Sequence, residues 1–221
     1  MALLEPIPPR ILAVQRLYNA DPAILRAYGA DPARHTSLGL ITVDQDDPTY
    51  VALDEATKHA PVDVVFAKSF YAGSGHASGP LSGEILGVLA GADPDVVEAG
   101  LKALINCLEH DACFYAADHD RKTAVFPHVI GSLGDYLSAQ AGLEPGTPMA
   151  YLVAPPIEAT MGFDAAMKAA DVRVVKLFTP PTETNFAAAW LTGSLAECEA
   201  AAVAFCETVV RVAAGPRSPG R

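Results

Sequence analysis

A short acidic run and one later glutamate are the residues of this sequence best suited to bind a cation. The run Asp44-Gln-Asp46-Asp47 follows a segment of strand composition, and Glu84 stands at the end of a glycine-rich segment. Carboxylates only accept hydrogen bonds, whereas a primary ammonium group offers three N–H donors and a positive charge. We therefore expect Asp46, Asp47 and Glu84 to face a small channel and bind a small amine. Phe114 is expected to add a backbone acceptor and an apolar wall.

The same acidic run also fits a structural role without a ligand. Asp-Asp-Pro is typical of a turn, in which the carboxylates cap backbone N–H groups and stay in water. A calcium loop of the EF-hand type would need a central glycine and a distal glutamate, and the run has neither. An amine site and a solvated turn thus remain the two interpretations.

The glycine-rich segment 68–83 is the longest stretch of turn composition in the chain. Its central residues have the wrong spacing for a dinucleotide-binding loop, and several glycines permit many backbone conformations. If three subunits meet on an axis, this segment can line and gate a pore. The residues assigned to that role are Gly73, Ser74, Gly75, His76 and Gly79.

Other catalytic and metal-binding patterns are weak. The six histidines have no spacing typical of a metal site, and there is no Gly-x-Ser-x-Gly sequence for a nucleophilic serine. The four cysteines are scattered without a Cys-x-x-Cys pair, which indicates reduced thiols. We expect no metal and no cofactor.

Composition excludes several classes of protein. The 221 residues include 15 Lys+Arg and 26 Asp+Glu, a formal net charge of −11, which disfavours binding to nucleic acid or to an anionic membrane. The apolar runs are shorter than the ~20 residues that span a bilayer, and the first residues do not resemble a secretion signal. Because 51% of the residues are apolar, we expect part of the surface to be covered in an oligomer.

The two halves of the chain repeat one another. Residues 54–65 align with 164–175 at a constant offset of 110, with matching Asp, Ala, Lys and Val positions. The aligned pattern predicts strands at 37–43 and 149–153, and it predicts long helices at 94–109 and 195–213. It also predicts a short helix closed by glycine before the first strand of each pair. This order predicts an α+β fold of two tandem ferredoxin-like domains, residues 1–110 and 111–221.

Six stretches of sequence, which follow one another along nearly the whole chain, are similar to one known family. They are residues 37–50, 53–58, 71–73, 150–160, 180–186 and 191–194. Together they resemble the EutL family of shell proteins from bacterial microcompartments for ethanolamine utilisation. The resemblance implies circularly permuted shell domains and a homotrimer that imitates a hexamer. It further implies a place in the shell of a cytoplasmic microcompartment, next to other shell proteins, and no catalytic activity.

The resemblance makes ethanolamine the natural small metabolite for the acidic residues. Two other classes of function stay open on the residues alone. One is a tandem ferredoxin-like regulatory protein that binds a small molecule. The other is an enzyme that uses Asp and Glu side chains at the domain interface.

Overall fold

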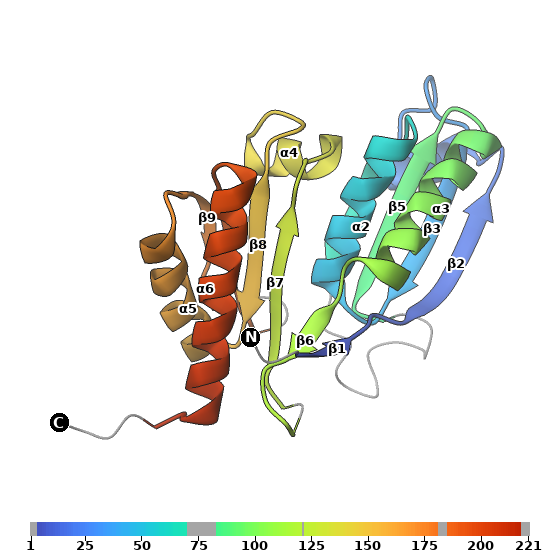
Figure 1. Cartoon of the computed structure of the whole chain (residues 1–221). Coiled ribbons are helices and arrows are strands. Elements are labelled where there is room, and N and C mark those ends of the chain that lie inside the picture. The colour runs from blue at the N-terminus through green and yellow to red at the C-terminus, as the bar shows by residue number, and fades with distance from the viewer. Residues whose placement is uncertain (1–3, 70–82, 121, 181–184, 218–221) are drawn as a thin grey trace. The chain divides into compact units, whose positions relative to one another are not determined.

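The computed structural model describes residues 4–69, 83–120, 122–180 and 185–217 (Figure 1). The chain divides into two compact units. The N-terminal unit consists of Pro8–Ala112 and Leu133–Pro145, and the C-terminal unit consists of Met1–Ile7, Cys113–Ser132 and Gly146–Arg221. Both units are therefore built from more than one stretch of the sequence.

The N-terminal unit contains an antiparallel sheet of four strands in the order β2-β3-β5-β4. Successive side chains of these strands point to opposite faces, and both faces are apolar, so each must be covered. The strands are β2 (Ile11–Leu17), β3 (Ser37–Val43), β4 (Asp63–Ser69) and β5 (Ile85–Gly91).

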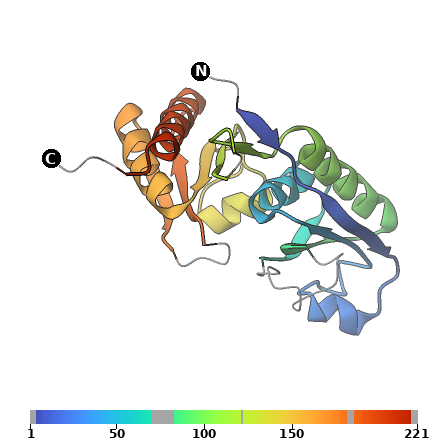
Figure 2. The same ribbon diagram turned by 90° about the horizontal axis from the view of Figure 1, so that it is seen from below.

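Helices cover both faces of this sheet. The long helices α2 (Asp46–His59) and α3 (Pro94–His110) pack side by side on one face (Figure 1). The short helix α1 (Pro22–Ala27) lies on the opposite face (Figure 2), where its Leu25 joins a buried cluster with Leu38 of β3. Most residues of the central strands β3 and β5 are thus removed from water, whereas the edge strands β2 and β4 remain partly exposed.

The C-terminal unit contains a six-stranded antiparallel sheet in the order β1-β6-β7-β8-β10-β9. Four of its strands repeat those of the N-terminal unit, and β1 and β6 extend the sheet beyond β7. The strands are β1 (Glu5–Ile7), β6 (Phe114–Ala116), β7 (Ala124–Ile130), β8 (Met149–Ala154), β9 (Arg173–Phe178) and β10 (Ala187–Thr192).

Two helices cover one face of the second sheet. They are α5 (Pro156–Ala169) and α6 (Leu195–Ala214), and the stacked rings of Phe163 and Phe205 pack between them with centroids 5.5 Å apart. Ser194 begins α6 with a capping box, in which its side chain accepts from the N–H of Glu197.

The repeat predicted from the sequence is confirmed. Each copy runs strand, short helix, strand, helix, strand, strand, helix, and the helices expected at 94–109 and 195–213 are α3 and α6. The predicted α+β fold is therefore confirmed. The position of α4 (Asp135–Ala141), the short helix of the second copy, was not predicted. This helix packs in the N-terminal unit against α2.

Candidate ligand site at the start of helix α2

The predicted turn at Asp46, Asp47 and Pro48 is wrong, because these residues form the first turn of α2. Proline needs no hydrogen-bond partner for its nitrogen in a first turn, and carboxylates are favoured near the positive end of the helix dipole. Both carboxylates are largely buried, with 8% of each residue exposed. The interpretation as solvated turn residues is therefore also wrong.

Asp46 is fixed by bonds on both of its carboxylate oxygens. Ser69 Oγ donates to Oδ2 over 2.7 Å, and the N–H of Asp47 donates to Oδ1 over 2.9 Å. The N–H of Ser69 donates in turn to the hydroxyl of Tyr50, over 3.2 Å. Burial, followed by the charge of Asp46, raises the pKa of Tyr50 above its ordinary value, so this hydroxyl stays protonated. The start of α2 is thus tied to the last residue of β4.

Glu84 reaches the same cluster because of the glycine before it. Gly83 has a positive φ of 64°, and a Cβ atom there would lie 2.2 Å from the carbonyl oxygen of Val43. The N–H of Glu84 donates to that same oxygen over 2.8 Å. Glycine therefore allows the chain to approach the end of β3 closely, next to the start of α2.

The electrostatics of Glu84 indicate crowded negative charge. Burial is the largest cause that raises its pKa above the ordinary value, and the charges of Asp46 and Asp44 raise it further. Asp44 is itself held by Arg10. The side-chain Nε of Arg10 donates to Oδ2 of Asp44 over 2.7 Å, and its backbone N–H donates to Oδ1 over 2.7 Å. A cation beside these carboxylates would offset the repulsion, which is a smaller cause of the raised pKa than burial.

The remaining predicted site residues are not joined to this cluster by the described structure. Phe114 lies in β6 of the C-terminal unit, where its ring packs on Phe126 and Phe186, and its role beside the acidic residues stays a prediction. The gating residues Gly73, Ser74, Gly75, His76 and Gly79 lie outside the described residues.

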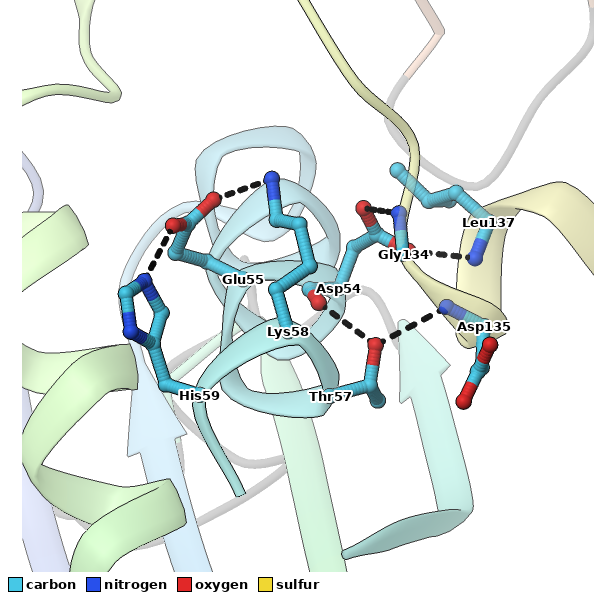
Figure 3. A network of polar contacts seen from close by, with 8 residues as sticks. All are labelled: Asp54, Glu55, Thr57, Lys58, His59, Gly134, Asp135 and Leu137. Carbon is cyan, nitrogen blue, oxygen red and sulfur yellow. Dashed lines mark hydrogen bonds and ion pairs between the residues drawn. The ribbon is translucent and has the colours of Figure 1, made fainter. Parts of the chain in front are cut away.

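A second polar network, which holds α4 on α2, was not predicted (Figure 3). Both oxygens of Asp54 accept backbone N–H groups at the start of α4, from Gly134 over 2.7 Å and from Leu137 over 2.8 Å. Thr57 Oγ1 accepts the N–H of Asp135 over 3.0 Å and donates to the carbonyl of Asp54 over 2.7 Å. Side chains of α2 therefore cap a helix that belongs to the other sequence copy.

The glycine at the start of α4 explains why the cap comes from another helix. Gly134 occupies the N-cap position and has no side chain that can accept a bond. A Cβ atom at this position would lie 2.4 Å from Thr57 Oγ1 and 2.6 Å from the carbonyl oxygen of Asp54. The missing side chain thus creates both the need for a cap and the space for it. No signal in the sequence identifies Asp54 as this cap, because Asp164 stands at the equivalent position of the repeat.

In the described part of the chain, no helix is long and apolar enough to cross a membrane. Within the same residues, no group of three or more His, Cys, Asp and Glu side chains has a geometry that could hold a metal ion.

Comparison with known proteins identifies relatives along the whole chain. A family model described as the BMC domain matches residues 37–120. The bacterial microcompartment shell protein EutL of Clostridium perfringens is 49% identical over 210 residues, which cover 95% of this chain and 96% of that protein. The protein of the same name from Salmonella typhimurium is 47% identical over 216 residues, which cover 98% of each chain.

A solved structure shares the fold over the same extent. The ethanolamine utilization protein EutL of Leptotrichia buccalis superposes with a TM-score of 0.93 at 44% identity, covering 98% of this chain and 99% of that chain. These relatives match both copies of the repeat, and they favour a shell protein over the regulatory alternative.

Proposed function

Because this chain belongs to the EutL family of bacterial microcompartment shell proteins, we propose that it builds a shell for ethanolamine utilisation and has no catalytic activity of its own. The family assignment rests on relatives at 47% and 49% identity over nearly the full length. The proposed role is structural: copies of the chain tile a protein layer with other shell proteins and let small metabolites pass.

The proposed assembly is a homotrimer. The repeat copies 1–110 and 111–221 are proposed as two shell domains, so three chains supply six similar domains around one axis. Fusing two copies in one chain lets the two halves differ while the outline stays close to sixfold. Light scattering should give a mass in solution of three times 23.1 kDa. A monodisperse monomer at micromolar concentration would contradict the proposal.

The proposed ligand of the acidic cluster is a primary amine, with ethanolamine as the candidate. The observation that carries this proposal is a group of buried and half-buried carboxylates, in which burial, and after it the charges of Asp46 and Asp44, raises the pKa of Glu84. An ammonium group among Asp46, Asp47 and Glu84 would gain charge-assisted hydrogen bonds of about 1.5–3 kcal/mol each. The free energies needed to desolvate the carboxylates and to immobilise the ligand offset much of this gain. We expect binding in the high micromolar to millimolar range, on the order of 4–6 kcal/mol.

Titration calorimetry with ethanolamine tests the proposed site. Glu84→Gln keeps the size of the side chain and removes its charge, so the affinity should fall several-fold while the mass in solution is unchanged. Asp95→Asn is the matched control, because Asp95 is an exposed acid in the first turn of α3 and its replacement removes the same charge. An equal response of the two variants, or no binding by the wild type, would refute the amine site without affecting the family assignment.

A further inference from the structure

Arg10 carries a positive charge beside the acidic residues at the start of α2. It precedes β2, and Asp44 follows β3, so the two residues lie next to each other at one end of the sheet. The backbone N–H of Arg10 donates to Oδ1 of Asp44 over 2.7 Å, and its side-chain Nε donates to Oδ2 over 2.7 Å. The N–H of Asp44 donates in return to the carbonyl oxygen of Arg10 over 3.2 Å. Of these three bonds, only one uses the guanidinium group.

The position of Asp44 therefore does not depend on the guanidinium group. The two bonds to backbone atoms of Arg10 can form with any residue except proline at that position. The side chain of Arg10 is 78% exposed, whereas that of Asp44 is 23% exposed. Loss of the guanidinium should leave the carboxylate in place and change mainly the charge around it.

Asp44 acts on the acidic cluster through its charge. Burial is the largest cause that raises the pKa of Glu84, and the charges of Asp46 and Asp44 follow. The charge of Asp44 is thus felt at Glu84. A guanidinium group bonded to Asp44 opposes this effect, because two opposite charges in contact partly cancel each other at a distance. Arg10 therefore reduces the negative potential that a cation meets at the cluster.

The second copy of the repeat forms the same junction without such an ion pair. Ala154 and Pro155 lead from β8 into α5, where Asp44 and Gln45 lead from β3 into α2. Neither residue of the second copy has a carboxylate. A strand and a helix are thus joined in this way without an acid and its counter-ion, so the pair of Arg10 and Asp44 is not a requirement of the fold.

We propose that Arg10 is a built-in counter-ion of the acidic cluster, which weakens the binding of cationic ligands there. The proposal rests on the amine site of the proposed function and adds a residue that sets its affinity. A guanidinium and an ammonium have the same sign of charge, so the presence of one disfavours the other near Asp44 and Glu84. Weak binding suits a layer that lets small metabolites pass, because a tightly bound amine would block the way.

Titration calorimetry with ethanolamine tests the proposal on three variants of the full chain. It is done at about pH 8, well above the range in which a glutamate ordinarily titrates. Arg10→Gln removes the positive charge and should bind about 2- to 5-fold more tightly, which is the size of one screened charge pair. Asp44→Asn leaves the guanidinium without its partner and should bind more weakly by a similar factor. The affinity of the double variant should lie between those of the two single variants.

The opposite signs of the two effects separate charge from structure, because a distorted site would bind more weakly in both variants. Arg34→Gln is the matched control. Arg34 is an exposed arginine of the same unit, and its guanidinium lies 3.1 Å from the carboxylate of Asp63. Its replacement removes the same charge and should leave the affinity unchanged. Equal or weaker binding by Arg10→Gln would overturn the role of Arg10 and leave the amine site standing.

Nuclear magnetic resonance of the Glu84 carboxyl carbon gives a readout that needs no ligand. In Arg10→Gln the pKa of Glu84 should rise by about 0.3–0.7 relative to the wild type, because the charge of Asp44 is no longer offset. If the pKa rises and the wild type binds no ethanolamine, the amine site is wrong and Arg10 is still the counter-ion. If the pKa is the same in both proteins, the proposal for Arg10 is wrong.

Discussion

Removal of the Asp54 carboxylate should destabilise the N-terminal unit by about 2–4 kcal/mol. In Asp54→Ala, the N–H groups of Gly134 and Leu137 lose acceptors at 2.7 and 2.8 Å. A buried donor without a partner costs about 1–3 kcal/mol, so two donors set the scale of the loss. Part of that loss is offset, because the alanine variant no longer buries a charged carboxylate. Burial disfavours the charged form of Asp54, as its raised pKa shows. The net effect should still exceed that of an ordinary helix cap, which is about 1 kcal/mol.

Hydrogen exchange measured by mass spectrometry locates the effect. If α4 opens separately from the rest of the unit, the loss corresponds to exchange that is roughly 30- to 1,000-fold faster in the peptide covering residues 133–145. Peptides from α6, in the other unit, should be unaffected. Denaturant unfolding gives the free energy for the whole unit, with the midpoint shifted to lower concentration and the slope unchanged.

The repeat provides the control variant. Asp164 is the same residue type at the equivalent position of α5, and its side chain is 60% exposed with a single surface partner, Lys168. Asp164→Ala should therefore cost less than about 0.5 kcal/mol. If the two alanine variants lose the same stability, or if exchange in 133–145 is unchanged in Asp54→Ala, then the carboxylate does not hold α4 and apolar contacts do.

Three more predictions concern the same unit. Gly134→Ala should destabilise it by at least ~2 kcal/mol in denaturant unfolding, because the new Cβ would lie 2.4 Å from Thr57 Oγ1. Gly83→Ala should weaken ethanolamine binding in calorimetry, because a Cβ 2.2 Å from the Val43 carbonyl, at a positive φ, displaces Glu84. Ethanolamine affinity should fall on acidification, and the fall should begin above the ordinary pKa of a glutamate. The reason is that protonation, favoured by the raised pKa of Glu84, removes the charge that an ammonium needs. Constant affinity through that range would contradict the role of Glu84.

The spacing of apolar residues, together with the residues that begin and end helices and strands, predicts most of the fold. The strand 37–43 and the helices 94–109 and 195–213 agree with β3, α3 and α6 to within a residue, because proline, glycine and capping residues mark their ends. The strands β1 and β6 were not predicted. Each has only three residues, which is too short for alternation to show, and among the described residues β1 pairs with β6, which pairs in turn with β7.

The start of α2 shows where local composition misleads. Asp-Asp-Pro is compatible with a turn and with the first turn of a helix, and burial against β4 and the Glu84 segment decides between them. The residue types and their spacing were enough to predict that these carboxylates form one acidic cluster. The contact with Ser69 could not be predicted, because it depends on where a strand 23 positions later ends.

The cap of α4 by Asp54 depends on information that lies entirely outside the local sequence. Asp54 and Asp164 follow similar residues and precede a lysine at the same spacing, yet one is buried and the other forms a surface pair. The difference comes from what packs on each helix. A short helix that begins with Gly134 reaches α2, whereas the described residues place no such helix on the exposed face of α5.

Comparison of the two copies at three further positions shows that only one of them carries the acidic cluster. Asp47 belongs to the acidic cluster at the start of α2, and its counterpart in the second copy is Ile157, which is 69% exposed. The positions of Asp44 and Asp46 are likewise occupied by Ala154 and Pro156. A ring of six identical single domains would carry the acidic residues in every domain. Two copies in one chain can differ, so the proposed trimer has three acidic sites, one in each N-terminal unit.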